Sequence, residues 1–474
     1  MQFLKSFQIK ADWFVFWSNL MFHNQWKKGI TFFLLLVFVF LSTITCGILL
    51  ENQSAYAVKD EDWNRFLKNK NFSEAVNQVE KHWERDYEEY FEQNLADFRL
   101  TAEDIAKTLS QISQQTATKP AVIWMWPREK QLQLVIITPG KKPQVYSVPE
   151  ADKKTLIDLV KKLNVEITSP SRRRTKSYLQ PAQTLYNWMV KPLESTLKTE
   201  KIDTIIFCLG MGLRTLPIAA LHDGNNFLVE KYSIARIPAF NLMNPNYKKT
   251  KYSQVLAMGA SEFSQQESLP AVPVELKEIT QDLGSSKQFI NQEFTLKNFQ
   301  AQRKKQPYEI VHLATHAEFN PGKPAQSYIQ FWGNERIRLD EIDKLNLDKP
   351  QVDLLVLSAC RTALGDQDAE LGFAGVTVKS GVRSVLASLW NVSDVGTLAL
   401  MTEFYQDLQE IPLKAKALQA AQVAMIKGEV GLKMGALQGS NGSLQLPSEL
   451  AELRDETFSH PYYWSAFTII GNPW

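Results

Sequence analysis

The chain has 474 residues, of which 44% are hydrophobic and 22% are charged, and its formal net charge is +2. This composition is ordinary for a globular protein, and the length predicts two or three domains. We expect no nucleic-acid partner, because such binding needs a clustered basic surface. The basic run from Arg172 to Arg174, with Lys176 nearby, is explained more simply as a solvated loop. Three cysteines predict no disulfide framework.

The first strongly patterned segment is residues 29–50, which are mostly apolar and carry no charge. A stretch of this length is sufficient to cross a bilayer as a helix. Lys27 and Lys28 precede it, and Glu51 follows it. The basic flank is therefore expected to stay in the cytoplasm while the rest of the chain is exported.

A pattern of small residues typical of a signal-peptidase site follows at Ala55 and Ala57. Two interpretations of residues 1–57 stay open: a signal peptide cleaved near Ala57, or an uncleaved single-pass anchor. Translation from Met21 instead of Met1 would give a more ordinary signal peptide. Both interpretations predict that the remaining chain lies outside the cytoplasm, either anchored to the cell membrane or released as a periplasmic or secreted protein.

Residues 58–118 have a helical pattern, with apolar residues such as Trp63, Phe66 and Leu67 at three- and four-residue steps. Residues 71–76 resemble the first helix of a tetratricopeptide repeat, but one degenerate copy cannot form a solenoid, because stacked repeats share a core. We predict a helical hairpin that packs on the following domain. Recognition of a partner protein is the alternative use of this region.

Residues 119–250 begin with strands and continue with helices. Turn residues separate three short apolar or alternating runs, which predicts an antiparallel meander. Cys208, in a later apolar run, is expected to be a buried strand residue. The strands are expected at 121–126, 132–138, 144–148 and 204–208, and the helices near 153–163 and 182–197.

Residues 251–474 alternate between strand and helix patterns. The strand runs are continuously apolar, as in parallel sheets that are covered on both faces. This alternation predicts a doubly wound α/β sheet. The strands are expected at 253–260, 309–315, 354–357 and 384–389, and the helices near 274–283, 371–381, 396–408 and 414–427.

Two of these strands deliver reactive side chains near their C-terminal ends, where ligands bind in open α/β sheets. His316 ends the first run, and Cys360 follows it by 44 residues at the end of the second. A neighbouring imidazole can generate the reactive thiolate, so the two side chains form a candidate nucleophilic pair. The alternative is that Cys360 is a small core residue, which is common for a cysteine that ends a buried strand.

The motifs around these residues resemble the CHAT domain, over roughly residues 120–474. They are His-Leu-Ala-Thr-His at 312–316, Leu-Ser-Ala-Cys-Arg-Thr-Ala-Leu-Gly-Asp at 357–366, the segments 381–394 and 210–222, and His-Pro-Tyr-Tyr-Trp-Ser-Ala-Phe at 460–467. The resemblance implies a caspase-like doubly wound sheet of the caspase and separase group of cysteine peptidases. Residues 119–250 would then be a degenerate N-terminal caspase-like lobe, and residues 251–474 the catalytic half.

The resemblance also implies roles for individual residues. Cys360 would be the nucleophile and His316 its acid–base partner, and the backbone N–H groups of Cys360 and Ala317 would form the oxyanion hole. CHAT domains usually carry Gly at the position of Ala317. His312, four residues before His316 and on the same face of the strand, is expected to be a core histidine bonded to backbone.

Separase prefers Arg before the cut, and an acidic residue after the strand that follows its nucleophile pairs with the substrate cation. Residues 389–394 resemble that segment, so Asp394 is the candidate floor of an S1 pocket for Arg or Lys, which it would bind through a charge-assisted pair. A helix N-cap is the alternative role of Asp394. Asp366 would add negative potential, and Trp390 would line the pocket or pack in the core.

The sequence therefore predicts an exported cysteine endopeptidase that cleaves protein substrates with a Cys–His dyad. The alternative is a catalytically silent CHAT scaffold or a regulatory interaction module, with a protein partner. No cofactor or metal ion is implied. The partners expected are a protein or peptide substrate, and the membrane if the N-terminal segment stays uncleaved.

Overall fold

The computed structural model describes residues 60–474, apart from 97–98, 250–251, 253, 282–285 and 441. The predicted signal peptide or anchor in residues 1–57 therefore lies outside the described residues. None of the described helices is both long and apolar enough to span a bilayer.

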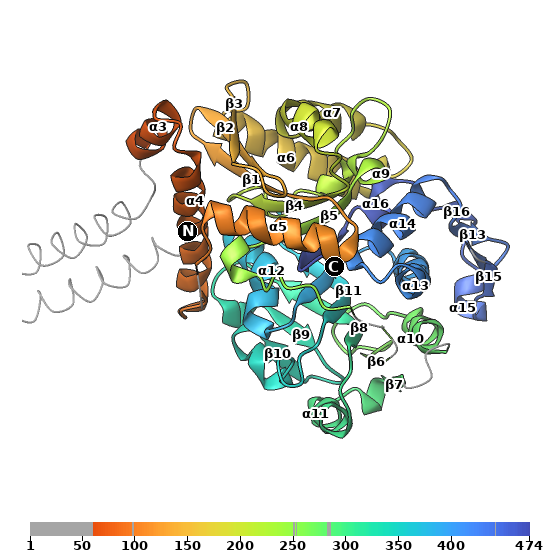
Figure 1. The fold of residues 1–474 in the computed structure, drawn as a ribbon. Coiled ribbons are helices and arrows are strands. Elements are labelled where there is room, and N and C mark those ends of the chain that lie inside the picture. Colours follow the sequence, from red (N-terminus) through yellow and green to blue (C-terminus); the bar gives the residue numbers. More distant parts are fainter. Residues whose placement is uncertain (1–59, 97–98, 250–251, 253, 282–285, 441) are drawn as a thin grey trace, which may run out of the picture. The chain divides into compact units, whose positions relative to one another are not determined.

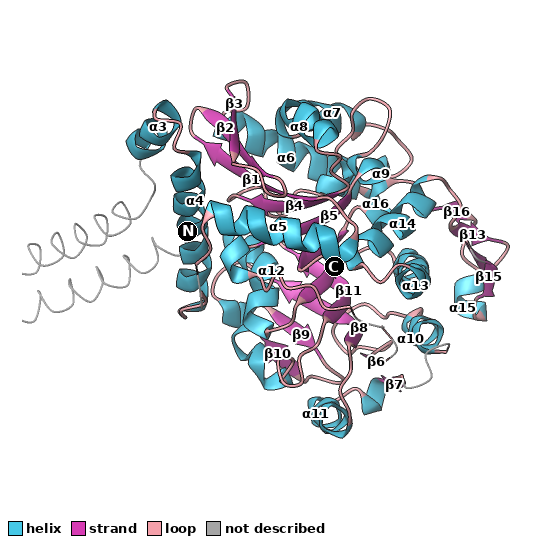
Figure 2. Cartoon of the chain, viewed as in Figure 1, coloured by secondary structure: helices cyan, strands magenta, loops and turns pink. Residues whose placement is uncertain are grey.

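A mixed sheet of 13 strands organises the described chain (Figures 1 and 2). Its order is β10-β9-β8-β11-β12-β17-β5-β4-β1-β2-β3, and β6 pairs with both β7 and β8. Most neighbours in the centre are parallel, and antiparallel pairs join β1 to β2, β2 to β3, β8 to β9, β9 to β10 and β12 to β17. The strands are β1 Pro120–Arg128, β2 Gln131–Ile137, β3 Gln144–Val148, β4 Thr204–Leu209, β5 Ser233–Ile237, β6 Val255–Gly259, β7 Lys287–Ile290, β8 Ile310–Phe319, β9 Tyr328–Gln330, β10 Arg336–Arg338, β11 Leu354–Thr362, β12 Ser384–Ser388 and β17 Phe467–Gly471.

Helices cover the two faces of this sheet. The helices α5 and α6 both pack against β1 and β2, and α12 and α13 both pack against β11 (Figure 1). A mixed α/β fold with a central, mostly parallel sheet is therefore confirmed. The helices are α3 Asp60–Lys68, α4 Phe72–Phe91, α5 Ala102–Thr116, α6 Lys153–Thr168, α7 Leu179–Met189, α8 Glu194–Thr199, α9 Leu228–Lys231, α10 Val272–Thr280, α11 Leu296–Lys305, α12 Gln367–Ser380, α13 Asp394–Glu410, α14 Lys414–Ile426, α15 Ser448–Ala451 and α16 Pro461–Trp464.

The last strand joins the two halves of the chain into one sheet. Strand β17 pairs antiparallel with β12, where Ile470 lies opposite Val385, and parallel with β5, where it lies opposite Arg236. All five of its residues are buried. The sequence pattern did not predict a strand here, and the fold places this C-terminal segment at the centre of the sheet.

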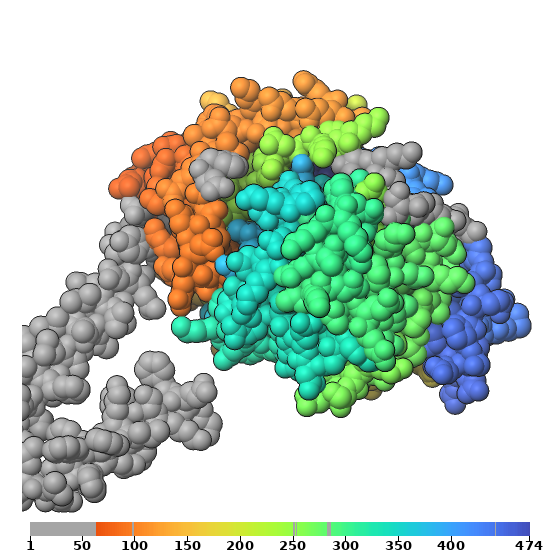
Figure 3. Space-filling view, turned by 90° about the horizontal axis from the view of Figure 1, so that it is seen from below, coloured from red at the N-terminus to blue at the C-terminus, as the bar shows by residue number. Residues whose placement is uncertain are grey.

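The N-terminal helices α4 and α5 pack against each other and against the rest of the described chain. Asn71 caps α4, and a capping box between Thr101 and Asp104 begins α5. Trp83, Tyr87 and Phe91 of α4 are buried. The helix α4 also contacts α12 of the second half. The red-to-orange surface of the N-terminal helices accordingly adjoins the cyan surface of the second half (Figure 3).

Two further features of the fold differ from the expectation. The single helix expected at 182–197 is divided into α7 and α8 by a 3₁₀ turn at Lys191–Leu193, because Pro192 has no N–H to continue an α-helix. A second, four-stranded sheet follows α14 in the order β15-β14-β13-β16. Its strands are β13 Gly431–Lys433, β14 Ala436–Gly439, β15 Gly442–Gln445 and β16 Glu456–Thr457.

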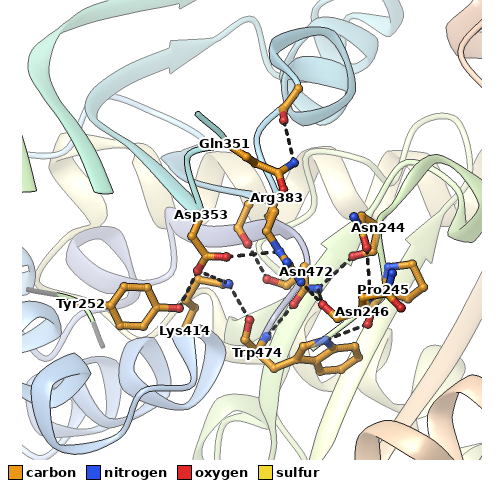
Figure 4. A network of polar contacts seen from close by, with 12 residues as sticks. Asn244, Pro245, Asn246, Tyr252, Gln351, Asp353, Arg383, Lys414, Asn472 and Trp474 are labelled. Atoms are coloured by element: carbon orange, nitrogen blue, oxygen red, sulfur yellow. Dashed lines mark hydrogen bonds and ion pairs between the residues drawn. The ribbon is translucent and has the colours of Figure 1, made fainter. Parts of the chain in front are cut away.

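A buried polar network secures the N-terminal ends of β11 and β12 (Figure 4). Asp353 precedes β11 and accepts from Lys414 at 2.9 Å and from Tyr252 at 2.7 Å. The guanidinium of Arg383, which precedes β12, lies 3.2 Å from the same carboxylate. Lys414 also donates to the main-chain oxygen of Trp474, just after β17. The network thereby ties the starts of two parallel strands to the segment after β17.

Candidate active site

The two strands that carry the predicted dyad are neighbours. Strands β8 and β11 run parallel, with His316 opposite Ala359 and Cys360 opposite Ala317. The register shifts between Leu357 and Ala359, so β8 has one extra residue at this point. Cys360 and His316 are thus one step apart in register at the C-terminal edge of the sheet, and because side chains alternate along a strand, the two side chains point to opposite faces in this conformation.

A hydrogen bond from Nε2 of His316 fixes the imidazole. Nε2 lies 2.8 Å from the carbonyl oxygen of Glu267, in the loop between β6 and α10. A carbonyl only accepts, so Nε2 carries the hydrogen and Nδ1 of the neutral ring is left as the acceptor. The ring of Phe263, in the same loop, packs on His316 with centroids 4.6 Å apart. Nothing in the sequence pattern marks Glu267, because it acts through its backbone.

His312 has a different environment from the one expected. It is fully buried, as predicted, but its ring bonds to side chains instead of backbone. Nε2 lies 2.8 Å from Oε1 of Glu275 on α10, and Nδ1 lies 3.0 Å from the hydroxyl of Tyr405 on α13. His312 therefore joins β8 to two helices below the candidate site.

The thiol of Cys360 is fully buried in this conformation. Its Sγ donates to the carbonyl oxygen of Leu357 at 3.3 Å, and no hydrogen bond joins it to His316. Burial raises the pKa of the Cys360 thiol to about 12, and the backbone N–H of Ser388 lowers that pKa in part. The structure thus brings the two strand ends together without pairing the two reactive groups.

The proposed oxyanion donors lie on the same two strands. The N–H of Cys360 donates to Oγ of Ser388 at 3.2 Å. Ala317 is buried and lies between Ile329 on β9 and Cys360 on β11. Its methyl group is accommodated in the strand. In this conformation the Cys360 donor is satisfied by Ser388, which the sequence analysis did not single out although it lies within one of the family motifs.

Asp394 lies at the start of α13 and lines a cleft of about 1140 Å³. Ser393, not Asp394, is the N-cap of α13. The Asp394 carboxylate instead accepts from the N–H of Ala271 at the start of α10. Burial raises the pKa of Asp394 to about 7, the Ala271 N–H opposes this rise, and the nearby Glu275 adds to it.

The cleft beside Asp394 is also lined by basic residues of the chain itself. Arg173 and Arg174 contribute to it, and the Arg173 guanidinium lies 3.6 Å from the centroid of the Tyr462 ring. Neither Cys360 nor His316 is among the described residues that line this cleft. Asp394 is therefore accessible to a ligand in this cleft, but the cleft does not include Cys360 or His316.

The other two S1 candidates have structural roles in this fold. Asp366 is the N-cap of α12, where its carboxylate accepts from the N–H groups of Asp368 and Ala369. Trp390 is buried, and its indole N–H donates to the carbonyl oxygen of Tyr462 at 3.0 Å. Of its two predicted roles, the structure assigns Trp390 the core position.

The sheet, the paired strand ends and the histidine oriented by a carbonyl define an α/β protein in which a histidine and a cysteine lie at the ends of neighbouring parallel strands, with no hydrogen bond between them. The CHAT domain family matches residues 179–472, which is more than half of the chain. The chain therefore belongs to the CHAT domain family. Comparison with curated proteins gives no match.

Comparison with solved structures gives remote similarities. Separase in the Saccharomyces cerevisiae separase–securin complex is 14% identical, with a TM-score of 0.43, over 85% of this chain and 34% of the separase chain. The chain thus spans about a third of that protein. Gingipain R, described as an Arg-specific cysteine proteinase, is 13% identical, with a TM-score of 0.37, over 68% of this chain and 74% of gingipain. Similarity at these scores says nothing about activity.

Proposed function

We propose that the chain is a cysteine endopeptidase of the CHAT family, which cleaves protein substrates with Cys360 as nucleophile and His316 as acid–base partner. The observation that carries this proposal is the hydrogen bond between Nε2 of His316 and the Glu267 carbonyl, at the end of the strand next to that of Cys360. A base oriented by a third group is the recurring signature of an activated nucleophile.

The carbonyl of Glu267 has a chemical consequence for the dyad. It holds the imidazole in the tautomer whose Nδ1 is free to take a proton. Nδ1 then accepts the thiol proton of Cys360, and the imidazolium that forms is stabilised by its bond to the Glu267 oxygen. The backbone carbonyl thereby serves the purpose that a carboxylate serves in a Ser-His-Asp triad.

The reaction would proceed in two steps. The thiolate attacks the carbonyl carbon of the scissile bond, the electron pair of the C=O bond moves to oxygen, and backbone N–H groups stabilise that charge. As the C–N bond breaks, the imidazolium gives its proton to the departing amine, which leaves a thioester on Cys360. Water then gives a proton to the imidazole and its oxygen to the acyl group, which releases the acid and the thiolate.

Substrate binding must rearrange the site before this chemistry begins. The Cys360 thiol is buried, and its pKa is about 12 because of that burial. An apo site often has long or unmade catalytic hydrogen bonds that tighten only with substrate bound. In this conformation the register turns the Cys360 and His316 side chains to opposite faces of the sheet, so we infer that a bound peptide reshapes the backbone at the end of β11 and thereby moves Sγ from the Leu357 carbonyl to the imidazole.

A preference for Arg or Lys before the cut is part of the proposal. Of the three S1 candidates, Asp394 lines the cleft of about 1140 Å³. A partly buried carboxylate favours a basic side chain through a charge-assisted hydrogen bond. Asp366 is engaged at the N-terminus of α12, so it supplies no pocket wall.

A silent scaffold is the second candidate function. It is favoured by the closed state of Cys360, which has no hydrogen bond to His316 and a pKa raised by burial. A buried cysteine with a raised pKa is typically inert. In that case, the same surfaces would serve a regulatory protein partner.

A covalent peptide probe with Arg at the position before its reactive group discriminates between the two functions. The fragment beginning at Val58 is incubated with the probe, alone and with candidate activating proteins. Peptidase function predicts labelling that is lost in Cys360→Ala and retained in Cys208→Ala, because Cys208 is an equally buried cysteine on β4. Labelling that survives Cys360→Ala would reject the assigned nucleophile. Cys360-dependent labelling would reject the silent scaffold.

We also propose that the chain acts outside the cytoplasm, either anchored through residues 29–50 or released after cleavage near Ala57. The proposal rests on the length of the apolar segment and on its basic flank. Fusion of a reporter that is active only after export, placed behind residue 57, tests it. A reporter that stays inactive, while an export-competent control works, would contradict export.

A further inference from the structure

The backbone around Cys360 is not part of the regular hydrogen-bonded pairing between β11 and β12. The pairing of β11 with β12 covers Leu354 to Leu357 and ends where Leu357 lies opposite Ala387. The next regular contact is from the Thr362 N–H to the carbonyl oxygen of Leu389. The peptide groups of Cys360 fall in this gap, and buried peptide groups need hydrogen-bond partners.

The side chain of Ser388, at the end of β12, fills this gap. Its Oγ accepts from the N–H of Cys360 at 3.2 Å and donates to the carbonyl oxygen of Cys360 at 3.2 Å. The side chain is fully buried. One hydroxyl group therefore satisfies both peptide groups of the nucleophile.

The backbone of Ser388 also affects the sulfur. Burial raises the pKa of the Cys360 thiol, and the Ser388 N–H opposes that rise because it stabilises the thiolate. Ser388 therefore contacts the N–H and the carbonyl oxygen of Cys360, and its own backbone N–H lowers the pKa of the Cys360 thiol. The first of these groups is the one that the proposed mechanism assigns to the oxyanion.

We propose that Ser388 is a positioning residue for the nucleophile: its hydroxyl holds the Cys360 peptide in place and yields the Cys360 N–H to the substrate oxygen during attack. This inference rests on the proposed peptidase function. Without the hydroxyl, a buried N–H and a buried carbonyl lose their partner, and the Cys360 peptide shifts relative to the Ser388 N–H. The thiolate then loses its stabilising donor.

The test uses alkylation of Cys360 by iodoacetamide, followed by mass spectrometry across pH, because this reaction requires no peptide cleavage. Ser388→Ala removes the hydroxyl, and Ser388→Thr keeps it. Ser384→Ala is the matched control, since Ser384 is an equally buried hydroxyl on the same strand that donates to the carbonyl oxygen of Asn472. Circular dichroism and urea unfolding establish that each variant is folded.

We expect Ser388→Ala to raise the pH midpoint of alkylation and to slow alkylation near neutral pH roughly 10-fold, as the loss of one hydrogen bond to a charged group would. The Ser388→Thr and Ser384→Ala proteins are expected to follow the wild type. In peptide cleavage, Ser388→Ala is expected to lower kcat roughly 10- to 100-fold with little change in KM, because the displaced N–H acts in the transition state.

Two results would overturn the inference. One is an alkylation profile of Ser388→Ala that coincides with that of Ser384→Ala. The other is a folded Ser388→Thr protein that reacts roughly 10-fold more slowly than the wild type near neutral pH, and this comparison with the wild type holds even if the alanine variant does not fold. Altered alkylation in a chain that cleaves no peptide would uphold the positioning role while rejecting the peptidase. Unaltered alkylation in a chain that does cleave peptides would reject the positioning role and uphold the peptidase function.

Discussion

Replacement of Asp394 by Asn tests the proposed preference for Arg or Lys. The Asp394 carboxylate accepts from the N–H of Ala271, and the amide oxygen of Asn can accept the same bond. Asp394→Asn therefore removes the negative charge from the cleft while keeping the contact that ties α13 to α10. Any change in specificity then reports on the charge and not on a displaced helix.

The expected magnitude follows from the partly buried position of this carboxylate. Two unit charges 4 Å apart attract by about 4 kcal/mol at an effective dielectric constant of about 20. Desolvation of the substrate guanidinium offsets part of this attraction energy. A charge-assisted hydrogen bond therefore contributes about 1.5–3 kcal/mol to binding. Asp394→Asn is therefore expected to lower kcat/KM for a substrate with Arg before the cut roughly 10- to 100-fold.

The pKa of Asp394 gives this preference a pH dependence. Burial, opposed by the Ala271 N–H and reinforced by Glu275, raises that pKa to about 7. Below that pH the carboxyl group is neutral and cannot pair with a cation. The ratio of kcat/KM for an Arg substrate to that for a Met substrate should therefore rise as pH increases through about 7 in the wild type. Any ionisation that affects the cleavage of both peptides equally cancels in this ratio.

The assay compares two peptides that differ only in Arg or Met before the cut, across pH, for three proteins. Asp394→Asn should give a low ratio that does not depend on pH. Asp366→Asn, a change at the N-cap of α12, is the control and should leave the ratio unchanged. If Asp394→Asn lowers kcat/KM equally for both peptides, the carboxylate has a structural role and the S1 assignment is wrong.

Three further predictions concern stability and are tested by urea unfolding. Lys414→Met should lower the free energy of unfolding by about 3 kcal/mol, because the buried Asp353 carboxylate loses one of its cationic partners. Lys416→Met, which removes a partly exposed ion pair with Asp203, should lower it by less than about 1 kcal/mol. Gly375→Ala should destabilise by about 1–3 kcal/mol, although Ala is the better helix former, since its Cβ would lie 2.6 Å from the Phe91 ring; a stabilised variant would contradict the α4–α12 contact. Burial raises the pKa of Glu80 from 4.5 to about 7, so stability should fall as pH rises between these values, and Glu80→Gln should remove most of that slope.

The elements that depend on local pattern were predictable. The antiparallel meander of β1, β2 and β3 and the capping box at the start of α5 follow from turn residues and helix-start signals. The apolar runs of β8, β11 and β12 also read as buried parallel strands, although the structure extends β8 to Phe319 and β11 to Thr362. The extensions contain polar residues, and they form strand because residues 359–362 of β11 pair with residues 316–319 of β8.

Partners that come from distant parts of the chain could not be read from the sequence. The apolar run of β17 gives no sign that it will insert between β5 and β12, because several strand edges would accept it equally. The third group at His316 is a backbone oxygen 49 residues upstream, and every residue has such an oxygen. Asp366 and Asp394 both stand near helix starts, and only the packing shows that Asp366 caps its own helix while Asp394 reaches α10.

Strand register couples the N-terminal ends of the central strands to their C-terminal ends. The buried polar network at the N-terminal ends therefore affects the candidate site at the C-terminal ends. A slip of one residue between neighbouring strands would turn each side chain to the other face of the sheet. The register of β8, β11 and β12 therefore decides how Cys360 lies relative to His316 and to Ser388. Apolar pairs such as Leu313 with Leu357 favour this register without excluding a slipped one. The buried ion pair between Asp353, just before β11, and Arg383, just before β12, opposes a slip between these two strands, because the slip would separate two charges in the core. Loss of this network should therefore lower the reactivity of Cys360 as well as stability.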